Sequence, residues 1–339
     1  MTTSPDDKTF KIAARQVAMK WKAVTTTLPD EARLPGEYRK YKALPFCLPQ
    51  KFNEFNLLPD AREIALERFS AAGIPWHDGV DNGPSNHLLS SQVQCANTLA
   101  PFVNDPLALA AIFGQVLSID EVLPFAAVRG AANLSPFDAT DFVVFEWQGL
   151  ENHLNEWVGT PTRGSKATSA DAAIRYRSTN GSIELALIEW KFTESYRTGH
   201  LATKSTSTAT RLSRYQALFD LPDGPIRSDI IQLEQLLGEP VYQLMRLSLL
   251  ARCIEANYEQ EVDRARVVYM APSANRALWA SPGTEAFTSH AAGRPLAETW
   301  ISLLREVNSV AFLDSASLLG DNSPVSDEFK SRYAVLSAD

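Results

Sequence analysis

Residues 170–192 read ADAAIRYRSTNGSIELALIEWKF and decide how this chain folds. Two apolar, strand-like runs, Ala170–Arg177 and Ile183–Phe192, flank the segment Ser178-Thr179-Asn180-Gly181. Asn-Gly between two such runs is the strongest short-range signal for a β-hairpin. The sequence therefore predicts an antiparallel hairpin that turns at Asn180-Gly181.

Three ionisable side chains interrupt this otherwise apolar hairpin. Asp171 lies near the beginning of the first strand, and Glu189 and Lys191 lie toward the end of the second. Antiparallel pairing across a turn at residues 179–180 places Glu189 opposite about position 170, beside Asp171. Because strand side chains alternate between faces, Glu189 and Lys191 point the same way and Trp190 points to the other side. The sequence thus predicts that two acids and an amine converge at one end of the hairpin.

Such a group has a chemical use. Two neighbouring carboxylates repel each other and raise one pKa, and a divalent cation such as Mg²⁺, which prefers hard oxygen ligands, relieves the repulsion. A nearby lysine can orient or deprotonate a water, or stabilise charge that develops on a phosphate. These residue types suit metal-assisted phosphodiester hydrolysis. A purely structural Asp-Lys-Glu ion network would use the same types, so context has to discriminate: a second triplet, Glu328-Phe329-Lys330, follows no strand-like run.

Length and composition indicate a globular protein. The chain has 339 residues, 45% of them hydrophobic, which is enough for one large domain or two modest ones. No apolar run approaches the roughly 18 residues of a membrane helix, and the first residues lack the apolar stretch of a signal peptide, so a cytoplasmic location is expected. Cys47, Cys95 and Cys253 are widely spaced without a CxxC pair, which predicts buried thiols rather than disulfides or a zinc ribbon.

The charge distribution is uneven. A net charge of -8 counts against nucleic-acid binding if it is taken over the whole chain. The segment 195–219, however, contains no Asp or Glu, and its basic residues are Arg197, Lys204, Arg211 and Arg214. We expect this segment to be a flexible phosphate-binding loop that orders over a substrate. An ordinary surface linker is the alternative.

The order of the expected elements indicates an α/β protein. Apolar periodicity and capping residues predict helices over 60–72, from Ser90 or Ser91 to about 101, and over 105–117, 239–258 and 297–310. Apolar, β-branched runs predict strands over 141–147, in the hairpin and over 266–271. This order implies a sheet with helices on its faces rather than an all-helical bundle. The first sixty residues mix basic helical stretches with proline-broken loops and are expected to form an N-terminal extension.

The segment TSADAAIRY...LALIEWKFTESY resembles motifs II and III of the PD-(D/E)xK nuclease superfamily. Together with HLLSSQVQCANTLAPF upstream and VYQLMRLSLLA downstream, it is similar to a bacterial restriction-endonuclease-like family that joins an SSQ helix to an Asp...Glu-x-Lys core. The similarity covers roughly residues 85–275. It implies a mixed central sheet flanked by helices, Mg²⁺ or Mn²⁺ held by Asp171 and Glu189, and Lys191 beside the attacking water. Many members add an acid from the first core helix, where this chain would place Gln92.

Further residues are candidates for substrate contacts. Gln92 and Gln94 diverge on a helix, so at most one faces the centre, and the resemblance favours Gln92. His87 precedes that helix and could meet a phosphate or simply close a loop. Gln243 and Arg246 share a face of the long helix, where they could contact phosphate or mark an exposed edge. Glu146, an acid within the first predicted strand, would need a partner if it is buried.

These observations lead to three expected regions: a mostly helical N-terminal extension (1–80), a nuclease core (81–275) and a C-terminal helical region packed on it (276–339). The expected function is that of a Mg²⁺-dependent DNA endonuclease in bacterial restriction, defence or repair, with DNA as partner, no membrane association, and a homodimer as a possible assembly. The choice of DNA depends on the resemblance. One alternative is a catalytically silent nucleic-acid-binding protein that retains the fold. Another is a soluble α/β protein whose charged hairpin is only structural.

Overall fold

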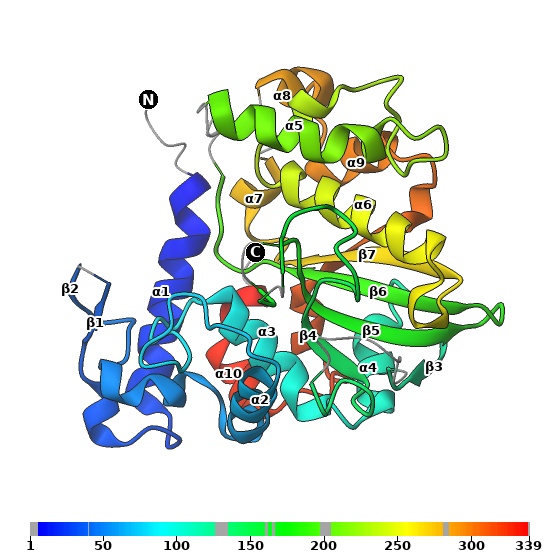
Figure 1. The fold of residues 1–339 in the computed structure, drawn as a ribbon. Coiled ribbons are helices and arrows are strands. Elements are labelled where there is room, and N and C mark those ends of the chain that lie inside the picture. The colour runs from blue at the N-terminus through cyan, green and yellow to red at the C-terminus, as the bar shows by residue number, and fades with distance from the viewer. Residues whose placement is uncertain are drawn as a thin grey trace.

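The predicted hairpin forms the centre of a six-stranded mixed sheet (Figure 1). The computed structural model describes residues 6–39, 41–125, 135–159, 162–164, 167–196, 205–280 and 285–337. Strands β5 (Ala170–Ser178) and β6 (Ile183–Trp190) pair antiparallel, with Ala172 opposite Ile188. This register is one residue from the expected one, and it brings Glu189 level with Asp171. Gly181 has a φ of +92°, a conformation that glycine adopts without steric cost.

Strands on both sides extend the hairpin into the full sheet. β3 (Ile119–Leu123) and β4 (Val143–Trp147) both pair antiparallel with β5, at its end and its beginning respectively. β7 (Arg264–Ala271) pairs parallel with β6, and β8 (Val310–Asp314) pairs parallel with β7. The strands predicted over 141–147 and 266–271 are therefore confirmed as β4 and β7. The fold is a mixed α/β sheet with helices on its faces, as the order of elements predicts.

Helices cover both faces of the sheet, as Figure 1 shows. Before the hairpin the chain forms α1 (Asp6–Val24), the small ribbon β1 (Gly36–Tyr38) and β2 (Tyr41–Leu44), α2 (Pro59–Ala71), α3 (Ser91–Leu99) and α4 (Pro106–Phe113). After it follow α5 (Ser205–Phe219), α6 (Val241–Ala256), α7 (Arg276–Ala280), α8 (Glu285–Ala291), α9 (Leu296–Ser302) and α10 (Asp327–Arg332). The helix expected to begin at Ser90 or Ser91 does so, because the Ser90 hydroxyl accepts from the amide of Val93 and caps it.

Two expectations for the second half of the chain are wrong. The helix expected over 297–310 ends at Ser302, and strand β8 follows it. Residues 205–219 of the expected flexible loop form helix α5 instead. Tyr215 and Phe219 on α5 are buried, and the Tyr215 ring packs against Tyr242 of α6, so the helix is docked through an aromatic face that the basic composition obscured.

The sheet separates two hydrophobic cores. Ile188 and Trp190 of β6 pack on the side of α1, α2, α3 and α10, whereas Leu185 and Leu187 pack on the side of α5, α6, α8 and α9. This alternation follows from the period of two along a strand. The N-terminal extension belongs to the first core, since the Trp21 indole of α1 donates to Glu328 at 2.7 Å. Within the described helices, none is long and apolar enough to cross a membrane.

The three cysteines are free thiols, as the sequence predicts. Cys47 and Cys95 are buried, and Cys253 is half-buried.

Candidate active site

Three acids lie side by side on adjacent strands. In the pairing of β4 with β5, Phe145 faces Ala172 and Trp147 faces Ala170, so Glu146 lies level with Asp171. On the other side of β5, the hairpin register brings Glu189 level with the same residue. Strand pairing therefore gathers Glu146, Asp171 and Glu189 in one row across the sheet.

Asp171 sits in the middle of this row. Its Oδ2 accepts a hydrogen bond from the backbone amide of Trp190 at 2.6 Å, which holds the carboxyl against β6. Burial, then the charges of Glu189 and Glu146, raise the pKa of Asp171 well above its ordinary value, against the opposing effects of Lys191 and the Trp190 amide. Part of the Asp171 side chain remains accessible to solvent. A positively charged ligand could therefore reach it and relieve the repulsion.

Glu189 and Lys191 form a buried ion pair, with 2.5 Å between Nζ and Oε1. Burial lowers the pKa of Lys191, but Glu189, Tyr196, Tyr269 and Asp171 together outweigh it, and the net pKa lies well above the ordinary value. Trp190 points to the opposite side, where its indole donates to Gln94 Oε1 at 2.9 Å. The structure thus brings Asp171, Glu189 and Lys191 together and places Trp190 away from them, as expected from the hairpin.

Gln92 reaches the acids through Glu146. Its Nε2 donates to Glu146 Oε1 at 3.0 Å, and its Oε1 accepts from the amide of His77 at 2.7 Å. Glu146 has a φ of +50°, a strained conformation for a residue with a Cβ. Burial raises the pKa of Glu146 to about 7, with Glu189 adding to the effect and the Gln92 hydrogen bond opposing it. The buried acid in the predicted strand thus has the partner it needs.

A positively charged surface, formed by arginines of α6 and α5, borders the site on its other side. Arg246 donates to Thr168 Oγ1 at 3.1 Å and lies over the ring of Tyr242 at 4.6 Å. Arg211 of α5 lies at the same distance from that ring. Burial raises the pKa of Glu239, while the charges of Arg246 and Lys191 oppose the rise. Glu239 therefore links this surface electrostatically to the Glu189–Lys191 ion pair. Reasoning from the sequence missed Glu239, which precedes Pro240 outside any strand pattern.

The described contacts do not connect His87, Gln243 or Arg214 to the row of acids. His87 lines a cavity between α1 and α3. The Gln243 side-chain oxygen is buried and has no hydrogen-bond partner among the described residues. Arg214 is half-exposed on α5, and the described contacts do not connect it to the carboxylates. Arg197 and Lys204 lie outside the residues that the structure describes.

The row of acids has the donor chemistry of a divalent-cation site, because carboxylate oxygens are hard ligands. In the described ranges, however, no three His, Cys, Asp or Glu side chains are already grouped to hold a metal ion. Glu146 is turned to Gln92 and Glu189 to Lys191. The Lys191 contact uses Glu189 Oε1, so a cation would depend first on Asp171 and on the other carboxylate oxygen of Glu189.

The mixed sheet and its helices define a protein of the restriction-endonuclease-like class, and a comparison with protein families agrees. The chain belongs to the family described as "Restriction Endonuclease associating with ARP", which matches residues 15–334. The match extends well beyond residues 85–275 and includes most of the N-terminal extension. Comparisons with curated proteins and with solved structures found no match.

Proposed function

We propose that this protein is a metal-dependent DNA endonuclease of the PD-(D/E)xK type that acts in bacterial restriction, defence or repair. Membership of a restriction-endonuclease family supports nuclease activity in general. The observation that carries the specific proposal is the Glu189–Lys191 ion pair level with Asp171 in an otherwise apolar hairpin. Burying charged groups of this kind costs stability, which favours a functional role for them.

Asp171 and Glu189 would hold Mg²⁺ or Mn²⁺ through carboxylate oxygens. When bound, the cation acts as a Lewis acid on a phosphate oxygen and lowers the pKa of a bound water. Lys191 has a raised pKa and therefore stays protonated at neutral pH. It would accordingly donate hydrogen bonds that position the attacking water or stabilise negative charge on the phosphate, rather than remove a proton.

Gln92 would hold Glu146 beside this pair and limit the number of free carboxylates. Because its amide spans Glu146 and the His77 backbone, it fixes the acid at a set distance from α3. This arrangement supports Gln92 as a positioning residue in the place where related nucleases carry an acid.

The basic side chains would contact the DNA backbone. Arg246 and Arg211, which lie against the ring of Tyr242, are suited to grip phosphate. The other substrate contacts in this proposal are His87, Arg197, Lys204, Arg214 and Gln243. A homodimer would allow both strands to be cut.

A catalytically silent DNA-binding protein is the main rival. The three groups required for hydrolysis are all present, which argues against it. Supercoiled and linear DNA should be incubated with the protein, with and without Mg²⁺, beside Lys191→Ala. We expect Mg²⁺-dependent cutting that Lys191→Ala reduces by at least about a hundredfold. DNA binding by both proteins without any cutting would instead support the silent protein.

A further inference from the structure

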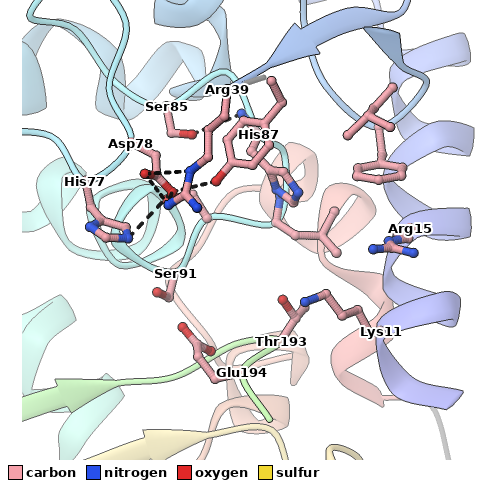
Figure 2. Close-up of a pocket in the computed structure, with 15 residues that line it drawn as sticks. Lys11, Arg15, Arg39, His77, Asp78, Ser85, His87, Ser91, Thr193 and Glu194 are labelled. Carbon is pink, nitrogen blue, oxygen red and sulfur yellow. Dashed lines mark hydrogen bonds and ion pairs between the residues drawn. The ribbon is translucent and has the colours of Figure 1, made fainter. Parts of the chain in front are cut away.

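A cavity of about 640 Å³ opens where the N-terminal helix faces the start of α3. Its lining comes from α1, from the β1–β2 ribbon, from residues 77–91 and from Thr193 and Glu194, which follow β6. This volume is typical of small-ligand sites. Figure 2 shows Lys11 and Arg15 projecting from α1 toward this space.

Lys11 and Arg15 bring two positive charges into the cavity without a direct acidic partner. Neither forms an ion pair with a carboxylate in the part of the chain that the structure describes. The Arg15 guanidinium lies 4.7 Å from the centre of the Phe46 ring, and its Nε is buried without a hydrogen-bond partner there. Burial and then Arg15 lower the pKa of Lys11, and Glu194 opposes them. An anion between Lys11 and Arg15 would relieve their repulsion and accept hydrogen bonds from their N–H groups.

The two acidic side chains that line the cavity, Asp78 and Glu194, already accept hydrogen bonds within the protein. Asp78 is paired with Arg39, whose Nε donates to Asp78 Oδ1 at 3.0 Å (Figure 2). Glu194 Oε2 accepts from the amide of Phe192 at 2.6 Å. These contacts leave the charges of Lys11 and Arg15 in excess over the remaining charge of Glu194.

His87 adds a neutral donor. Burial, then the charges of Lys11 and Arg15, lower its pKa to about 4, so the ring is uncharged at neutral pH. Its Nδ1 accepts from the amide of Leu89 at 3.1 Å, and the proton of the neutral ring must therefore be on Nε2. The ring also lies against Tyr38, 4.7 Å between centres. Cations, an N–H donor and aromatic surface in one cavity are the groups that bind a nucleotide.

The cavity adjoins the candidate active site. Glu194 follows Lys191 by three positions along the chain, and His77, which lines the cavity, donates its amide to Gln92. The same Gln92 side chain donates to Glu146 in the row of acids. Gln92 therefore connects the lining of the cavity to the row of acids.

We propose that this cavity binds the terminal phosphate of a nucleotide, with Lys11 and Arg15 of the N-terminal helix as its cationic ligands and His87 as a donor. A phosphate monoester carries nearly two negative charges and three acceptor oxygens, which match these groups. The phosphate could come from the end of a nucleic-acid strand or from a free nucleotide. The identification with a strand end rests on the proposed nuclease function, whereas the phosphate site itself does not.

The test measures binding of a fluorescent hexathymidylate with or without a 5′-phosphate, in EDTA so that hydrolysis cannot contribute. The wild type should bind the phosphorylated strand at least about tenfold more tightly, because a charge-assisted hydrogen bond contributes about one order of magnitude. The double variant Lys11→Gln/Arg15→Gln should lose this preference. Lys20→Gln/Lys42→Gln is the matched control, since it removes two exposed charges of the same extension and should retain the preference. Circular dichroism checks that both variants are folded.

Competition with thymidine 5′-monophosphate distinguishes the two sources. If thymidine 5′-monophosphate displaces the phosphorylated strand at a concentration close to that of the strand, the ligand is a free nucleotide. If it fails to displace the strand at a thousandfold excess, the ligand is a strand end. Either result supports the site. Equal binding of both strands by the wild type overturns the proposal, as does a preference that persists in Lys11→Gln/Arg15→Gln. DNA cutting in Mg²⁺ is measured separately. If the protein does not cut DNA, the binding measurements still test the phosphate site.

Discussion

Replacing Glu146 by glutamine should stabilise the protein, and the gain should depend on pH. Burial raises the pKa of Glu146 from 4.5 to about 7 in the folded state. Since one pKa unit corresponds to about 1.4 kcal/mol, ionising this carboxyl costs the folded protein about 3 kcal/mol. A glutamine side chain in place of the acid would keep an oxygen to accept from Gln92 and would carry no charge.

The sign follows from proton binding. The folded state holds the Glu146 proton more tightly than the unfolded state, so wild-type stability from this group is greatest below pH 4.5 and falls as the pH rises to about 7. The advantage of Glu146→Gln should therefore be under about 1 kcal/mol at pH 5 and about 3 kcal/mol at pH 8.

Urea unfolding in EDTA, followed by tryptophan fluorescence at pH 5 and pH 8, measures this difference. Glu63→Gln is the matched control, because Glu63 is exposed on α2 and should show no such change. An effect of Glu146→Gln that is the same at both pH values would refute the assignment of Glu146 as a destabilised, buried acid.

Two further substitutions test the framework around the site. Gly164→Ala should destabilise the fold by about 1–2 kcal/mol and displace Glu146, because the φ of Gly164 is +67° and an added Cβ would lie 2.9 Å from the Glu146 Cδ; an unchanged melting temperature would contradict this. Lys22→Met should cost about 3 kcal/mol in urea unfolding, since the buried Nζ donates to the carbonyls of Leu34 and Cys47 at 2.7 and 2.5 Å. A variant as stable as wild type would show that those carbonyls do not need the lysine.

The hairpin and its acids could be predicted because their signals are local. Asn180-Gly181 fixes the turn, and the alternation around Glu189 and Lys191 fixes which side chains meet. The one-residue difference in register arises because the connection has three residues, 179–181, with the Ser178 amide donating to the Ser182 carbonyl and Gly181 in the left-handed region.

Other features depend on contacts between distant segments. β3 is a short edge strand with two exposed acids, and β8 follows α9 in a stretch whose apolar spacing also fits a helix. The level position of Glu146 beside Asp171 depends on how β4 pairs, and the cavity joins residues 11, 87 and 194 from three separate segments. No local pattern in the sequence indicates that these segments meet.

The proposed nuclease activity depends most on a cation site built from Asp171 and Glu189. Titration of Mn²⁺ into wild type and Asp171→Asn by isothermal calorimetry at pH 7, in buffers of different ionisation enthalpy, tests it directly. Because burial and the charges of Glu189 and Glu146 raise the pKa of Asp171 well above its ordinary value, Mn²⁺ binding to the wild type should be coupled to proton release, and Asp171→Asn should bind Mn²⁺ much more weakly and release fewer protons. Equal affinity in the two proteins, or no binding to the wild type, would contradict the account.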